Sequence, residues 1–202
     1  MNRIPPQLVP QVPYITTWSG EESKRQRVVD RKAGPGIAFV DERPQDRDSR
    51  GLLWTRQKRA YGRGRPLFGQ VHSPRQRHAM DKLLCQVCAH PADRDPDGGV
   101  LWMLRDHRND WPDWPNGMAV TEPPICRNCV KVSAQRCPAM RKGHALIRAW
   151  AMPIAGVRGN LYRPTENGPV LIGPQVVWFG ADLRWVLGMH LVREFTEADV
   201  LN

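Results

Sequence analysis

The sequence has no long apolar run, and this absence excludes membrane-spanning and secreted classes of protein. Of the 202 residues, 41% are hydrophobic, but no stretch is long and apolar enough to cross a bilayer as a helix. The segment Met1 to Trp18 is interrupted by four prolines, so it lacks the apolar core of a secretory signal. We therefore expect a soluble, cytoplasmic protein in a reducing compartment, with no membrane partner.

Cysteines are also few, and their odd number argues against a disulfide framework. A chain of 202 residues can bury a core without disulfides. Four of its five cysteines form two Cys-x-x-Cys pairs, Cys85 with Cys88 and Cys126 with Cys129. Two intervening residues let one tight turn direct both sulfurs at the same ion, and four thiolates complete a tetrahedral zinc site. The sequence therefore predicts a structural zinc ion. Three further residues could each replace one ligand: Cys137, His90 and His144.

Acidic residues are scarce in the first part of the chain. Residues 1–84 contain 17 Lys and Arg against 8 Asp and Glu, whereas residues 85–202 contain 13 against 12, within a net charge of +10. Arginine supplies 24 of the 30 basic residues, and its planar fork suits phosphates and guanine edges. A GC-rich coding sequence would also favour arginine, so the clustering of charge is the stronger argument. It predicts a nucleic-acid partner.

A short basic segment precedes the first cysteine pair. Arg63-Gly64-Arg65-Pro66 resembles an AT-hook, in which an extended Arg-Gly-Arg lies in a narrow minor groove. The alternative is an ordinary basic turn. The residues that we predict to contact nucleic acid are Arg56, Lys58, Arg59, Arg63, Arg65, Arg75, Arg77 and Lys82.

Local patterns predict elements on both sides of the cysteine pairs. Strands at 37–42 and 52–56 would form an N-terminal hairpin. Ser73, Pro74 and Gln76 form a capping box that starts a helix ending near Leu84, with Arg75, Arg77 and Lys82 facing solvent or phosphate. Pro96-Asp97-Gly98 indicates a turn, and residues 100–104 a strand.

The second half of the chain is predicted in the same way. A helix from Arg127 should end by Cys137, because Pro138 disfavours helical geometry in the preceding residue. Strands follow at 144–152, 156–162 and 176–179. Asp182 would cap a final amphipathic helix over 183–195, in which His190 is a core or boundary residue. We predict three segments: a basic Pro- and Gly-rich region (1–70), a zinc module (71–141) and a C-terminal α/β element (142–202).

The order of helix, Cys-x-x-Cys, turn, strand, long loop, Cys-x-x-Cys and helix over residues 75–141 is typical of a treble-clef zinc module. It resembles in particular the zinc-bearing HNH endonucleases, most closely at Leu84 to Cys88 and Ile125 to Cys129. The resemblance implies a catalytic His on the strand between the pairs. That strand reads Val-Leu-Trp-Met-Leu, and the candidate catalytic residue, His107, comes only after it.

We therefore expect an α+β protein with a small treble-clef-like four-cysteine zinc module, an N-terminal hairpin and a C-terminal strand-helix extension. Its expected function is nucleic-acid binding without catalysis, and no small-molecule substrate is evident. Two alternatives stay open at this point. One is a structural or protein-interaction zinc protein from a phage or mobile element, and the other is a divergent HNH nuclease that uses His107.

Overall fold

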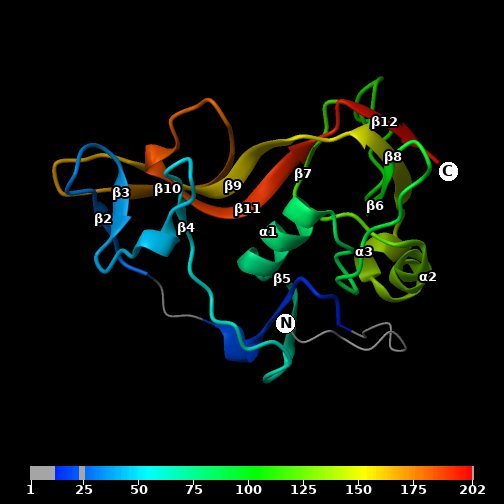
Figure 1. Cartoon of the computed structure of the whole chain (residues 1–202), viewed down its shortest axis with the longest axis horizontal. Helices are drawn as coiled ribbons and strands as arrows, with labels where there is room; N and C mark the ends of the chain where they lie inside the picture. Colours follow the sequence, from blue (N-terminus) through cyan, green and yellow to red (C-terminus); the bar gives the residue numbers. More distant parts are fainter. Residues whose placement is uncertain (1–11, 23–25, 202) are drawn as a thin grey trace. The chain divides into compact units, whose positions relative to one another are not determined.

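The computed structural model describes residues 12–22 and 26–201 and has the predicted α+β composition, with strands predominating (Figure 1). Residues 1–11 and 23–25 of the predicted N-terminal region lie outside the described residues. Within the described part of the chain, no helix has the length and apolarity needed to span a membrane. The strands are β1 (Thr16–Trp18), β2 (Val28–Asp30), β3 (Ile37–Phe39), β4 (Leu53–Trp54), β5 (Pro66–Val71), β6 (Val100–Leu104), β7 (Ala119–Val120), β8 (Ala145–Ala151), β9 (Ile154–Arg163), β10 (Val170–Trp178), β11 (Val186–Glu194) and β12 (Glu197–Val200). The helices are α1 (Ser73–Lys82), α2 (Arg127–Arg136) and α3 (Pro138–Arg141), with 3-10 turns at Ser19–Glu21, Pro44–Asp46 and Leu183–Trp185.

The chain divides into two compact units, each built from separated segments. Unit 1 comprises Met1–Thr16, Gly69–Ile154 and Arg193–Asn202, and unit 2 comprises Thr17–Phe68 and Ala155–Val192. The division into segments 1–70, 71–141 and 142–202 remains a prediction from the sequence.

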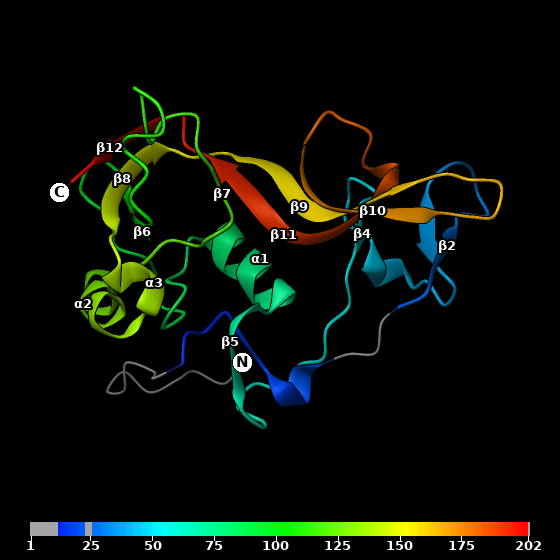
Figure 2. The ribbon, with the colours of Figure 1, turned by 180° about the vertical axis from the view of Figure 1, so that it is seen from behind.

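Unit 1 is organised by an antiparallel sheet in which β8 lies between β6 and β12 (Figure 2). Trp102 of β6 pairs with Ile147 of β8, and both side chains are fully buried. The indole of Trp102 also meets the ring of Phe195 edge to face, with centroids 5.1 Å apart. Every residue of β6 is buried, which explains its unbroken apolar sequence, since a strand covered on both faces has no polar side.

Helix α1 of unit 1 begins one residue earlier than its capping pattern predicts. His72 is the N-cap residue, and its Nδ1 accepts a hydrogen bond from the main-chain N–H of Arg75 at 3.4 Å. At the other end, the guanidinium of Arg193 donates to the carbonyl oxygen of Met80 at 2.8 and 3.1 Å. Carbonyls of a last helical turn have no partner within the helix, so Arg193 provides one.

Unit 2 contains a sheet with strand order β10, β9, β11, β4. β4 runs parallel to β11, with Leu53 beside Leu187, and β9 pairs with β10 in antiparallel fashion. One apolar cluster joins Leu53 and Leu187 to Ile37 and Phe39. A second cluster contains Leu52, Trp54, Val157 and Val186. Both clusters join residues from the two chain segments of the unit, so neither segment buries its apolar side chains alone.

The predicted pairing of residues 37–42 with 52–56 is wrong. Both segments contain strands, but β3 pairs with β2 through Val28 and Phe39, and β4 pairs with β11. The polar loop between them makes a 3-10 turn at Pro44–Asp46 instead of a hairpin turn. β3 therefore lies in a two-stranded sheet with β2, and β4 is the edge strand of the sheet that contains β9, β10 and β11.

The predicted C-terminal helix is also wrong. Asp182 does accept a hydrogen bond from the N–H of Arg184 at 3.0 Å, but it caps only the 3-10 turn Leu183–Trp185, and the chain then continues as β11. His190 lies in this strand and is buried, as predicted. Gly188 disfavours a helix in this segment and allows close packing against Trp54 within the sheet.

Candidate metal centre and candidate nucleic-acid residues

The first cysteine pair lies in a tight turn that follows α1. The N–H of Cys85 donates to the carbonyl of His90 at 2.7 Å, and the N–H of Ala89 donates to the carbonyl of Cys85 at 2.9 Å. Leu84 and Pro91 form an antiparallel bridge at the base of this turn. Ala89 has a φ of 62°, a left-handed conformation that a non-glycine residue rarely adopts. The turn therefore directs the sulfurs of Cys85 and Cys88 to one side.

The second pair lies at the start of α2. Cys126 is the N-cap residue, and the N–H groups of Cys129 and Val130 donate to its carbonyl oxygen at 3.0 and 3.1 Å. Both sulfurs thus belong to the first turn of the helix, whose N-terminal partial positive charge stabilises thiolates.

The four sulfurs form one compact group. All of them lie within 4.8 Å of one another, and the sulfurs of Cys88 and Cys126 are 3.7 Å apart. A tetrahedral ion with metal–sulfur bonds of about 2.3 Å requires sulfur–sulfur distances of about 3.8 Å. Cys85 and Cys129 are buried and the other two are half-buried. The residues present therefore fit a four-coordinate metal ion.

Hydrogen bonds among the crowded sulfurs separate the cysteines into two acidic and two weakly acidic groups. The hydrogen bond with Cys126 lowers the pKa of Cys88. That with Cys129 lowers the pKa of Cys126 to about 6. The pKa values of Cys85 and Cys129 are raised, in both cases chiefly by the hydrogen bond with Cys126. A bound cation would favour the thiolate form of all four cysteines.

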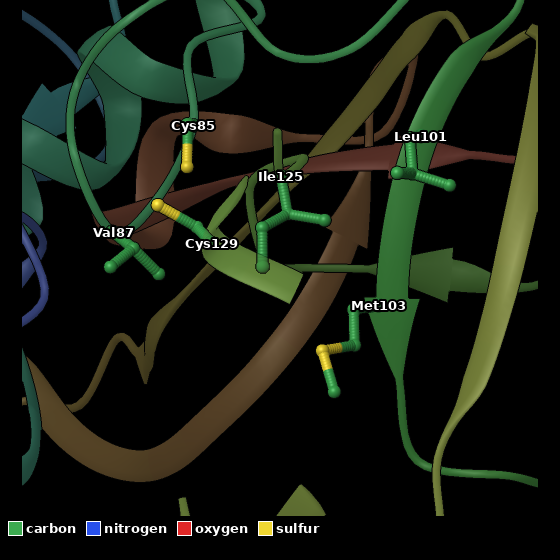
Figure 3. Packing of buried hydrophobic residues seen from close by; sticks show 6 residues of the cluster. All are labelled: Cys85, Val87, Leu101, Met103, Ile125 and Cys129. Carbon is green, nitrogen blue, oxygen red and sulfur yellow. The ribbon is translucent and has the colours of Figure 1, made fainter. Parts of the chain in front are cut away.

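A small apolar core surrounds the sulfurs. Figure 3 shows Cys85 and Cys129 beside Val87 and Ile125, with Leu101 and Met103 of β6 in the same cluster. The N–H of Ile125 donates to the carbonyl of Leu101 at 2.9 Å. Ile125, which precedes the second cysteine pair, is therefore hydrogen-bonded to β6, the strand that contributes Leu101 and Met103 to the cluster.

Asp93 holds the same region together through charge. Its carboxylate accepts hydrogen bonds from the buried Arg148 of β8 at 2.7 Å and from Arg127 of α2 at 3.0 Å. Arg148 also donates to the carbonyl of Gly99 at 3.1 Å. Asp93 thus connects the loop after the first pair with the helix that carries the second. No local pattern in the sequence indicates this role, because Arg148 lies 55 positions away from Asp93.

The three alternative ligands stand outside the group. Among the described residues, the group that could hold a metal contains only the four paired cysteines. His90 is exposed, the Nδ1 of His144 is 3.0 Å from the carbonyl oxygen of Met140, and Cys137 follows α2 as its half-buried C-cap residue. All five cysteines are described, and none is in a disulfide.

His107, the candidate catalytic residue, lies in a surface turn after β6. Its Nδ1 is 2.8 Å from the carboxylate of Asp110, and the two side chains are 36% and 55% exposed. The neighbouring Asp106 is paired with Arg108 at 2.8 Å. The hydrogen bond from Arg108 lowers the pKa of Asp106, so this carboxylate is an internal ion-pair partner of the turn.

Arg56 and Arg75, both predicted to contact nucleic acid, make extensive contacts within the protein. The guanidinium of Arg56 binds Asp46 at 2.5 Å and Asp41 at 2.8 Å. Arg75 is buried, and it donates to the main-chain carbonyls of Tyr14 at 2.6 Å and Thr16 at 2.7 Å. The prediction that Arg75 faces solvent or phosphate is wrong, because the chain before α1 needs hydrogen-bond donors for its carbonyls.

Four other predicted residues, Lys58, Arg59, Arg63 and Arg65, are exposed. Arg63 and Arg65 flank Gly64, which has a φ of 81°. Gly20 donates to the carbonyl of Arg63 at 3.0 Å, and Ser19 donates to the carbonyl of Arg65 at 2.9 Å. A Cβ on Gly64 would lie 2.1 Å from the Oγ of Ser19. Residues 63–65 therefore form a turn whose backbone is hydrogen-bonded to residues 19–20, and the side chains of both arginines are exposed.

The remaining two predicted residues belong to α1. Arg77 is half-buried and Lys82 is exposed, with the Lys82 amine 2.8 Å from the carboxylate of Asp81. Since α1 belongs to unit 1 and Lys58 to Arg65 belong to unit 2, the predicted basic residues are distributed over both units.

No protein-family model, curated protein or solved structure matches this chain.

Proposed function

We propose that the four cysteines hold one zinc ion and that the protein is a zinc-stabilised nucleic-acid-binding protein without catalytic activity. The observation that carries the proposal is the compact group of four sulfurs. Thiolate ligands in a tetrahedral arrangement favour zinc over the oxygen-preferring cations. Four protein ligands leave no open position for water or substrate, so the ion would contribute folding energy and no chemistry.

The site's surroundings support a treble-clef-like arrangement as part of this proposal. A turn carries one cysteine pair and the start of α2 carries the other, and α1, β6 and α2 follow one another in the expected order. The proposed resemblance to HNH endonucleases is limited to this order of elements. We propose no catalytic activity, because β6 contains only buried apolar residues and His107 lies in a surface turn beside Asp110.

The basic turn at Arg63 to Arg65 supports nucleic-acid binding. Both side chains are exposed, while the backbone between them is held by residues 19–20. Little backbone conformational entropy would therefore be lost when the two guanidinium groups bind together. We propose that the exposed Lys58, Arg59, Arg63 and Arg65 contact phosphates. Arg75 is not in this set because it is buried, and Arg56 is not in it because it forms an ion pair with the nearly buried Asp46.

The zinc proposal is tested by metal analysis of purified protein. We expect one zinc per chain, lost in Cys88→Ser and in Cys126→Ser but retained in Cys137→Ser, which removes the cysteine outside the group. Protein without zinc, or zinc retained in Cys88→Ser and Cys126→Ser, would refute it.

Nucleic-acid binding is tested by fluorescence anisotropy with a labelled duplex over a range of salt concentrations. Wild-type protein should bind with an affinity that falls steeply with salt as counterions are released. Arg63→Gln combined with Arg65→Gln should weaken binding, whereas Arg31→Gln combined with Lys32→Gln, an exposed pair of equal charge, should have less effect. Binding that the two double variants reduce equally would show that the turn has no special role.

A protein-interaction function is the second candidate, and β10 favours it. Val170, Leu171, Ile172, Val176 and Trp178 of this strand are 38–48% exposed, and in the described residues β10 pairs only with β9. An exposed apolar edge strand can add a strand from another chain. Sedimentation of the wild type and of Val176→Lys combined with Trp178→Lys tests this candidate, because association confined to the wild type would favour it.

A further inference from the structure

Helices α2 and α3 carry a second group of cations, all of them in unit 1. Between Glu122 and Glu166 the chain has no acidic residue in 43 positions but has eight Lys and Arg. Five of the eight lie on α2, α3 or the residue after α3, and all five are exposed. We call these residues the α2–α3 surface: Arg127, Lys131, Arg136, Arg141 and Lys142.

Most of this charge is not neutralised by the protein. Arg127 pairs with Asp93 at 3.0 Å. Within residues 12–22 and 26–201, the other four have no carboxylate within ion-pair distance. The surface therefore presents four cations to solvent, in addition to a partly satisfied Arg127.

The metal site does not account for these cations. A zinc ion with four thiolates would carry two negative charges, and α2 already offers its N-terminal partial charge to two of the sulfurs. Arg141 and Lys142 lie 12 or more positions beyond Cys129 in the chain. The four cations without an ion pair exceed the two negative charges of the zinc site, so neutralising that site does not explain them.

The helices that carry these cations pack against the core of unit 1. Val130 and Ala134 of α2 and Met140 of α3 pack against the core cluster that contains Cys85 and Cys129. The exposed side chains of these helices are therefore displayed from a backbone that the core and its metal ion would hold in place.

We propose that the α2–α3 surface binds the sugar-phosphate backbone of duplex nucleic acid. The inference deepens the proposed function and rests on it. Ten residues of α2 span about 15 Å, which corresponds to the axial rise of about four phosphates of one strand, at about 3.4 Å of duplex axis each. Cations at this density match a polyphosphate better than a single phosphate group.

A duplex fits the surface better than a single strand. Single-strand binding depends on aromatic side chains that stack on bases, and residues 127–142 contain no Phe, Tyr or Trp. Contacts from Lys and Arg to phosphates carry no sequence information. Binding through this surface should therefore favour duplexes over single strands and be nearly independent of sequence.

The test compares two quadruple variants with the wild type in the anisotropy assay. In the first, Lys131, Arg136, Arg141 and Lys142 are replaced by Gln. In the control, Gln replaces Arg31, Lys32, Arg105 and Arg163, which are also exposed. We expect the first variant to lose at least about tenfold in duplex affinity at 0.1 M salt and to lower the log–log salt slope by up to about 4. The control should change both quantities by much less.

The outcomes separate this inference from the proposed function. No duplex binding by the wild type would refute both. Wild-type binding that the two variants reduce equally would refute the surface alone, as would tighter binding to a single strand or to vesicles of anionic lipid than to a duplex. Zinc content and the unfolding midpoint are measured for each variant, and single substitutions replace any quadruple variant that does not fold.

Discussion

At the scale of single residues, several arginines in this protein act as donors to protein oxygens. The guanidinium of Arg56 binds Asp46 and Asp41 and lies 4.7 Å from the ring centroid of Phe39. Arg75 and Arg193 are buried and donate to main-chain carbonyls. Burial lowers the pKa of Arg193 by desolvation, yet the carbonyls around it supply hydrogen bonds to its charged form. Such arginines stabilise the fold and are not free to bind phosphate.

The Arg56–Asp46 pair gives a pH-dependent prediction. Hydrogen bonding to Arg56 lowers the pKa of Asp46 below its ordinary value of 3.8, and the Asp46 side chain is only 5% exposed. A lowered native pKa contributes stability that is complete above the unfolded pKa and is lost as the pH falls through the native value. We expect Asp46→Asn to lower the free energy of unfolding by about 2 kcal/mol at pH 7, with the difference from the wild type shrinking below pH 4.

Urea unfolding at several pH values measures this difference. Asp41→Asn is the matched control, because Asp41 binds the same guanidinium but is 66% exposed and should contribute little. A loss of stability in Asp46→Asn that is the same at pH 3 and pH 7 would contradict the assignment to this ion pair.

At the scale of elements, β11 shows how packing decides between helix and strand. The segment has an N-cap residue in Asp182 and apolar residues at helical spacing, but it pairs with β9 and β4 as a strand. Its Gly188 has no side chain between itself and the indole of Trp54. A Cβ there would lie 2.8 Å from Cε3 of that ring, closer than ordinary van der Waals contact.

Gly188→Ala should therefore destabilise the protein by overpacking. We expect a cost of about 1–3 kcal/mol, measured as the shift in urea midpoint. Trp54→Leu removes the ring that the new methyl would meet, so Gly188→Ala should cost less in that background. Equal costs in both backgrounds would show that close contact with Trp54 is not the reason for glycine at this position.

At the scale of the whole molecule, we expect the two units to differ in their dependence on the proposed metal. The core cluster of unit 1 includes Cys85 and Cys129, while the two apolar clusters of unit 2 contain no cysteine. Without the ion, the four cysteines lose the metal–sulfur bonds that would join the two pairs, so the cluster around them loses stability.

Removal of the metal with a chelator should consequently loosen unit 1 first. Hydrogen exchange should show the amides of Leu101 and Ile125, which donate to Asp93 and Leu101, losing protection before those of Val157 and Leu187. The Cys137→Ser variant with metal bound serves as the control and should exchange like the wild type. Simultaneous loss of protection at all four amides would indicate that the metal stabilises both units as one cooperative structure.

Local chemistry in the sequence was sufficient to determine several features. The cysteine spacing identified the four clustered sulfurs, because a two-residue separation acts within one turn. Pro74 marked the first turn of α1, and Pro138 marked the end of α2, because the backbone effects of proline reach only its neighbours. The strands predicted at 144–152 and 156–162 are present as β8 at 145–151 and β9 at 154–163.

Tertiary structure alone decided which strands pair and which charges face solvent. β4 pairs with β11 across more than 130 positions, and Arg193 binds Met80 across 113, so no local pattern specifies either contact. The same holds for Arg56 and Arg75, whose partners are carboxylates and carbonyls from other segments. A sequence alone leads one to expect a charged side chain at the surface. The side chain is buried instead where oxygens of distant backbone or carboxylate groups need a hydrogen-bond donor.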